Sequence, residues 1–178
     1  APDQALAYVR SLAAAGIPSW QLEYLYPWIT ERSDIEQRLA FARLVRPAVT
    51  DQPEMDRRLR SLIVEGLMVQ GKTQEAYDEA HDFAKVFPTS GNAWKLLAQA
   101  AEAAKQPYEA DKAWAVITGK AAPAMSVWWE GMIGRARIRI ASARPEQACE
   151  LLTQMGTQRE YVPEEFAKEF AALATTPD

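Results

Sequence analysis

Two side chains of this sequence have types that could support nucleophilic or metal chemistry, and the first is His81. It is the only histidine and lies among Asp78, Glu79 and Asp82 in a stretch with helical periodicity. Such neighbours could orient a base or bind a metal, but zinc requires three or four converging ligands. No second histidine exists and no cysteine is near in sequence. We therefore expect His81 on the solvated face of a helix, with no metal site.

The second such residue is Cys149, the only cysteine, so the chain can form no internal disulfide. It stands in the segment EQACELL, on the side of the helix that we predict to be apolar. No histidine is placed by sequence to activate the thiol, so we expect it to be buried and unreactive. The sequence also contains no Gly-x-Ser-x-Gly elbow and no phosphate-binding glycine loop. We expect no enzymatic activity and no cofactor.

The composition of the 178 residues excludes several other classes of function. A net charge of −4 and an isoelectric point near 5.2 argue against nucleic-acid binding, for which domains are usually basic. No apolar run reaches the roughly 18 residues of a membrane-spanning helix. Apolar residues make up 48% and charged residues 25%, as in ordinary folded domains. We expect a soluble protein that does not span a membrane, with the bacterial cytoplasm and periplasm both open as compartments.

Helix signals are dense along the chain and strand signals are nearly absent. Prolines stand where amphipathic runs begin and glycines where they end, as at the first position and the C-terminus of helices. Ser33 and Glu36 have the spacing of a capping box, and Pro27 should bend or shorten the helix that contains it. The patterns predict ten helices, over residues 2–15, 18–30, 34–46, 53–70, 73–87, 92–105, 108–118, 124–143, 146–155 and 164–174. Because the connections are short, consecutive helices should be antiparallel in an all-α fold.

Landmarks between Gly71 and Trp94 recur at a nearly fixed period. After 34 or 35 residues, Ala76 recurs as Ala110, Trp94 as Trp128, and Pro88 as Pro123. A period of this size with helix–turn–helix content is typical of stacked repeats, in which each hairpin buries its apolar face against its neighbours.

The residues Trp94, Leu97, Ala98, Ala110 and Pro123 resemble the repeat of the tetratricopeptide repeat family, and the resemblance is clearest over residues 57–155. It implies antiparallel hairpins stacked into a right-handed superhelix, an α-solenoid. The preceding repeat has Arg60 where the tryptophan would stand. The following one begins with Trp128 or Trp129 and has its small residue, Ala148, 38 residues after Ala110, so its first helix should be about one turn longer.

The resemblance implies three parts along the chain. Residues 1–52 would form degenerate helical hairpins that can continue an upstream array. Residues 53–156 would form about three repeats, and residues 157–178 a capping helix and tail. A second copy of the chain could pair through an open terminal hairpin, which would give a homodimer.

In this family the first helix of each repeat lines a concave groove that takes peptides. Carried onto this sequence, the groove positions are Arg58, Ser61, Glu65, Met68, Asn92, Lys95, Gln99 and Glu102. The chaperone-binding members hold a C-terminal carboxylate with several asparagines and lysines. Asn92 is the single asparagine here, so we expect no such clamp.

The predicted helix over residues 124–143 offers a further candidate surface. Arg135 and Arg139 share a face with Trp128, and an aromatic ring between arginines is a common composition for an interface hot spot. In the simpler alternative, which we favour, Trp128 is buried and the arginines pair with acidic residues such as Glu146 and Glu150.

These patterns favour a non-catalytic scaffold that binds a protein or peptide. The alternative is a helical accessory domain of a larger cell-envelope or polysaccharide-handling protein, contacting glycan through aromatic faces. Trp20, Tyr24 and Trp28 would supply such a face, although their four-residue spacing is more simply explained as a core face.

Overall fold

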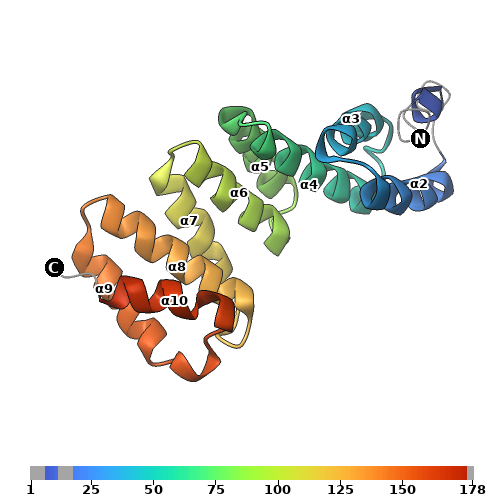
Figure 1. The fold of residues 1–178 in the computed structure, drawn as a ribbon. Helices are drawn as coiled ribbons and strands as arrows, with labels where there is room; N and C mark the ends of the chain where they lie inside the picture. Colours follow the sequence, from blue (N-terminus) through green and yellow to red (C-terminus); the bar gives the residue numbers. More distant parts are fainter. Residues whose placement is uncertain (1–6, 12–17, 176–178) are drawn as a thin grey trace. The chain divides into compact units, whose positions relative to one another are not determined.

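The computed structural model describes residues 7–11 and 18–175, and all regular structure in these residues is helical (Figure 1). The all-α prediction is confirmed, and the described residues contain no strand. Residues 7–11 of the predicted first helix are helical, and the rest of that prediction lies outside the described residues. Within the described part of the chain, no helix has the length and apolar character needed to cross a membrane.

The helix boundaries agree with the predicted ranges to within about two residues at most ends. In chain order the elements after residues 7–11 are α2 (Ser19–Arg32), α3 (Ile35–Val45), the 3₁₀ turn η1 (Arg46–Ala48), α4 (Pro53–Val69), α5 (Thr73–Val86), α6 (Gly91–Ala103), α7 (Pro107–Thr118), α8 (Ser126–Ala141), α9 (Pro145–Gly156), the 3₁₀ turn η2 (Arg159–Tyr161) and α10 (Glu164–Ala174).

The chain forms two compact units, Ala1–Leu96 (unit 1) and Leu97–Asp178 (unit 2), and the division falls within α6. In unit 1, α4 packs against both α3 and α5. In unit 2, α8 packs against α7 and α9, and α10 covers both α8 and α9. Consecutive helices therefore pack as hairpins, the arrangement expected of a helical repeat.

Three hairpins close with the same backbone geometry. The second residue after the end of the first helix has a positive φ in each, 71° at Gly71, 58° at Lys105 and 53° at Ala143. The next residue donates its N–H to the carbonyl five residues back in all three: Lys72 to Leu67 at 3.0 Å, Gln106 to Ala101 at 2.8 Å and Arg144 to Arg139 at 2.9 Å. This is the Schellman motif. A buried alanine follows five residues after each of these turns, at Ala76, Ala110 and Ala148.

Tryptophan contacts correct the register of the repeat. The Trp94 indole N–H donates to the Pro88 carbonyl at 2.9 Å, and Trp129 donates to Pro123 in the same way at 2.8 Å. Trp129, and not Trp128, is therefore the counterpart of Trp94, at a distance of 35 residues. The spacing of 38 residues between Ala110 and Ala148 is three residues longer than this distance. Helix α8 accounts for the difference, because it has 16 residues against 13 in α6. The prediction of a longer first helix is confirmed.

The core of unit 2 gathers on α8, α9 and α10. Trp128 and Trp129 meet edge to face with ring centroids 5.1 Å apart, and Phe170 of α10 contacts Trp129 at 5.8 Å. These rings pack with Met132, Ile133, Ala136, Leu151 and Met155. Edge-to-face pairs of this kind add to the stabilisation from apolar burial.

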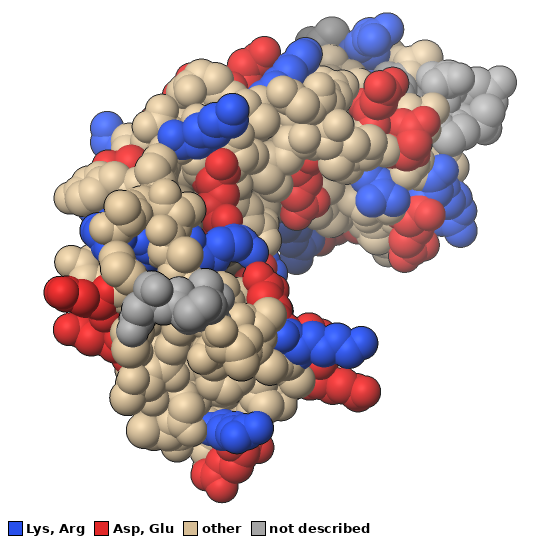
Figure 2. Space-filling view, turned by 60° about the vertical axis from the view of Figure 1, so that its left-hand side comes forward, with Lys and Arg blue, Asp and Glu red and all other residues tan. Residues whose placement is uncertain are grey.

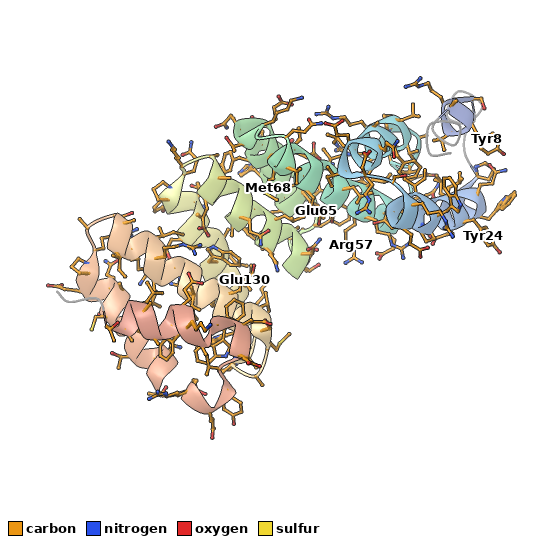
Figure 3. All side chains as sticks on the ribbon, in the orientation of Figure 1. Tyr8, Tyr24, Arg57, Glu65, Met68 and Glu130 are labelled. Carbon is orange, nitrogen blue, oxygen red and sulfur yellow. The ribbon has the colours of Figure 1, made fainter. Side chains whose placement is uncertain are left out.

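Two local predictions in the first half of the chain were wrong, and a third was wrong in part. The capping box of α3 is made by Asp34 and Gln37, one residue after the predicted Ser33 and Glu36. Helix α2 continues through Pro27 to Arg32, so the proline, which was expected to bend or shorten it, does not shorten it. Finally, α2 buries Leu22 and Ile29, whereas Trp20 and Tyr24, expected in the core, are 62% and 77% exposed. Tyr24 projects from the outer side of α2 (Figure 3).

Candidate functional site

The structure brings together the groove residues that the sequence places on α4 and on the start of α6, which we call the unit 1 face. It consists of Arg58, Ser61, Glu65, Met68, Asn92 and Lys95. Asn92 donates its side-chain amide to the Ser61 hydroxyl at 2.8 Å, so residues 31 positions apart are neighbours. Asn92 is exposed and the other five are half-buried. Figure 3 labels Glu65 and Met68, which follow each other along α4.

Residues of α2 and α3 extend this face and change its electrostatics. The Arg58 guanidinium binds Glu23 at 3.1 Å and lies over the Tyr26 ring at 5.7 Å. Burial raises the pKa of Glu65 above 4.5, an effect only partly offset by the positive charges of Arg38 and Lys95. The face therefore holds a carboxyl group that is protonated more readily than an exposed one.

Arg57 belongs to the same side of α4 and was missed by the sequence analysis. One of its terminal nitrogens binds Glu54, whereas its buried Nε has no hydrogen-bond partner among the described residues. Buried polar atoms are nearly always paired, so an unpaired N–H donor is a group that a ligand can satisfy. Figure 3 labels Arg57 beside the other residues of α4.

In unit 2, the predicted Gln99 and Glu102 of α6 line a pocket of about 300 Å³ with residues of α7, α8 and α10. Gln99 donates to Glu130 at 2.9 Å. Arg137 bridges Glu102 of α6 at 2.7 Å and Glu169 of α10 at 3.0 Å. The pocket, which we call the unit 2 face, is lined by Gln99, Glu102, Trp114, Glu130, Ile133, Arg137, Phe166 and Glu169.

The residues predicted on α8 do not lie on this face. Trp128 is 3% exposed, so the favoured alternative of a buried ring is correct. Arg135 and Arg139 turn towards α7, where they bind the two oxygens of Asp111 at 3.0 and 3.2 Å. The arginines are therefore paired, as that alternative expected, although Asp111 takes the place of Glu146 and Glu150.

The corrected register explains which α8 residues were missed. With Trp129 as the counterpart of Trp94, the positions of Lys95 and Glu102 correspond to Glu130 and Arg137, both of which line the unit 2 face. The prediction chose Arg135 and Arg139 because they share a face with Trp128, which lies one residue, or about 100° of helix rotation, from the counterpart of Trp94. The six-residue separation of Pro88 from Trp94, repeated by Pro123 and Trp129, was the sequence signal that identifies the right ring.

The two residues considered for catalysis lie apart from these faces. His81 is exposed, as expected, and its ring lies 6.1 Å from that of Tyr77. Among the described residues, no group of histidine, cysteine or acidic side chains could hold a metal ion. Cys149 is exposed on α9, so the expectation of a buried thiol was wrong.

Charge on the visible surface is mixed. Lysine and arginine side chains are interspersed with aspartate and glutamate in Figure 2, with wide areas of uncharged residues between them. A single-sign field would attract a partner over a long range. The face of the molecule drawn in Figure 2 shows no such single-sign area.

Comparison with known proteins gives no family for this chain. No protein-family model matches it, and neither a curated protein nor a solved structure does. The repeated turns and tryptophan contacts of the chain itself therefore carry the argument for its architecture.

Proposed function

We propose that this protein is a non-catalytic scaffold of tetratricopeptide-type hairpins, stacked in a right-handed superhelix, that binds an extended segment of a partner protein along its first helices. The observation that carries the proposal is the hydrogen bond between Ser61 and Asn92. It joins two positions that the repeat pattern assigns, independently of each other, to one binding surface.

The side chains of the unit 1 face have the chemistry needed to hold a peptide backbone. Asn92 keeps its carbonyl oxygen as an acceptor. The Ser61 hydroxyl donates its proton to the Arg57 carbonyl at 3.1 Å and keeps a second lone pair as an acceptor. The unpaired Nε–H of Arg57 adds a donor. Met68 supplies a flexible apolar contact that adapts to different side chains. Together these groups match an extended segment with exposed backbone amides.

Selection from a random dodecapeptide display library tests this proposal. Wild-type protein should enrich peptides that lose at least tenfold in affinity when Asn92 and Ser61 are both replaced by alanine. Gln154→Ala on α9 is the control, because it also removes an exposed polar side chain but lies on a second helix. Circular dichroism would verify that each variant is folded. Failure to enrich any peptide, or equal losses in test and control variants, would refute the proposal.

A second candidate function, a helical accessory domain of a cell-envelope or polysaccharide-handling protein, is favoured by the aromatic face of α2. Trp20 and Tyr24 are exposed on consecutive turns, where flat rings can stack on sugar rings. A titration with oligosaccharides should then change the tryptophan fluorescence of the wild type but leave that of Trp20→Ala nearly unchanged. A wild-type signal that does not respond would eliminate this function.

A further inference from the structure

A groove on unit 1, separate from the unit 1 face, lies between η1, α4 and α5. Its volume is about 720 Å³, within the roughly 300–1,000 Å³ of typical ligand pockets. Its lining combines three arginines, five carboxylates and apolar side chains: Arg43, Arg46, Pro47, Thr50, Asp56, Arg60, Ile63, Leu67, Glu75, Asp78, Glu79, Asp82 and Val86. We call it the α4–α5 groove.

Four of these side chains form a closed ring of ion pairs. Arg60 binds Asp56 and Glu79, each at 3.0 Å, and Arg46 binds the same two carboxylates at 3.2 and 3.0 Å. The Arg60 side chain is only 10% exposed. Because each arginine meets both acids, the ring is electrically balanced and its members are held in place.

The ring stands where the other repeats have a tryptophan. Arg60 occupies the position of Trp94 and Trp129, and Glu79 occupies that of the buried Ala113 and Leu151. Charged side chains thus stand where the other repeats have an indole and an apolar side chain. Arg60 and Glu79, the two residues that depart from the repeat pattern, both line the groove.

Two carboxylates of the groove have no cationic partner among the described residues. Arg43 lies 3.5 Å from Glu75, which leaves Asp78 and Asp82, four residues apart on one side of α5. Within the described part of the chain, Asp78 accepts a hydrogen bond only from the neutral Gln74, and Asp82 makes no ion pair. Like charges at this spacing repel each other on a helix, a cost that a bound cation would remove.

We propose that the α4–α5 groove binds a lysine or arginine side chain of a basic segment in a partner protein. Long cationic side chains combine an apolar stem with a charged head. Pro47 and the half-exposed Val86 offer apolar contact for the stem, and Asp78 with Asp82 offers the counter-charge. This is a second binding surface, distinct from the one that holds the peptide backbone in the proposed function.

Fluorescence anisotropy with labelled octapeptides tests the proposal directly. An alternating Arg-Ala peptide should bind the wild type, and an alternating Gln-Ala peptide should bind at least tenfold more weakly. The double variant Asp78→Asn with Asp82→Asn should reduce affinity for the Arg-Ala peptide at least tenfold. Both residues are exposed, so these isosteric changes leave the buried structure intact.

The chain supplies a closely matched control in Glu146 and Glu150, two exposed acids four residues apart on α9. Replacing both by glutamine removes the same charge and should change affinity less than twofold. Equal losses in the two double variants would mean general attraction by an acidic protein and would overturn the proposal. Absence of Arg-Ala binding by the wild type, or unchanged binding by the Asp78 and Asp82 variant, would overturn it as well.

A further variant separates the shape of the groove from its charge. Arg60→Trp combined with Glu79→Ala copies the residues that the next repeat has at these positions, and it leaves Asp78 and Asp82 in place. The indole should fill the groove and abolish binding while circular dichroism shows a folded protein. Full retention of binding by this folded variant would contradict the groove as the site. Binding by the unit 1 face is measured with other variants, so the two proposals can fail separately.

Discussion

Replacing Gly134 by alanine should destabilise unit 2 although alanine is the better helix former. A Cβ at this position would lie 2.7 Å from Nε1 of Trp114 and 3.1 Å from both Cδ1 and Cε2. Carbon contacts are most favourable at about 3.5–4.0 Å, so the methyl group overlaps a rigid ring. Trp114 is 2% exposed, and its indole N–H is fixed by Glu102 at 2.6 Å, so the ring has little room to retreat.

The expected magnitude follows from two opposing effects. Overpacking of a core costs about 1–3 kcal/mol, and a ring held on both sides belongs near the upper limit. The change from glycine to alanine inside a helix contributes about 1 kcal/mol in the opposite direction. We therefore expect the free energy of unfolding to fall by about 2 kcal/mol, measured by urea titration with circular dichroism and tryptophan fluorescence.

The same substitution at Gly156, the last residue of α9, is the matched control. A Cβ there would meet nothing within 4 Å, so Gly156→Ala should leave stability unchanged or raise it by up to about 1 kcal/mol. The double variant Gly134→Ala with Trp114→Phe should be at least about 1 kcal/mol more stable than the sum of the two single losses predicts, because the smaller ring makes room for the methyl group. A Gly134→Ala protein as stable as the wild type would refute the overlap argument.

Two further predictions concern the register and the unit 1 face. Trp129→Ala should lower the free energy of unfolding by about 3–5 kcal/mol, and Trp94→Ala by less, because Trp129 is fully buried and Trp94 only half-buried; the reverse order in urea titrations would contradict the register. Since burial raises the pKa of Glu65 in the folded state, the folded protein binds this proton more tightly than the unfolded chain, and stability is lost as pH rises from about 4.5 through the folded pKa. Glu65→Gln should therefore melt at a higher temperature than the wild type at pH 7 and at a similar temperature at pH 4. A variant that melts below the wild type by the same amount at both pH values would contradict the predicted direction of the pH dependence.

The helices could be predicted from the sequence because residues at the ends themselves determine where a helix begins and stops. Proline at a first position and glycine after a last turn act through their own backbone, so Pro53, Pro107 and Pro145 each begin a helix as expected. The left-handed turn residues Lys105 and Ala143 carry no such signal, because neither is a glycine. Their position follows only from the repeat, which fixes the turn five residues before each buried alanine.

The faces of the helices were harder to predict, because tertiary partners decide them. Trp20 and Tyr24 have core spacing but lie on the outer side of α2, where the described residues leave them exposed. Asp111 binds both Arg135 and Arg139 from another helix, more than twenty residues away in sequence. The ring around Arg60 likewise needs η1 and α5 beside α4, a convergence that no single segment reveals.

Because Arg60 stands where the other repeats have a tryptophan, tryptophan fluorescence reports on only part of this protein. All six tryptophans lie before residue 29 or after residue 93, so the α4–α5 hairpin contains no indole fluorophore. Loosening of its ion-pair ring by salt would leave the emission from unit 2 unchanged. Far-ultraviolet circular dichroism sees every helix, so a change in that signal without a matching change in tryptophan emission would report on helices that carry no indole, α4 and α5 among them.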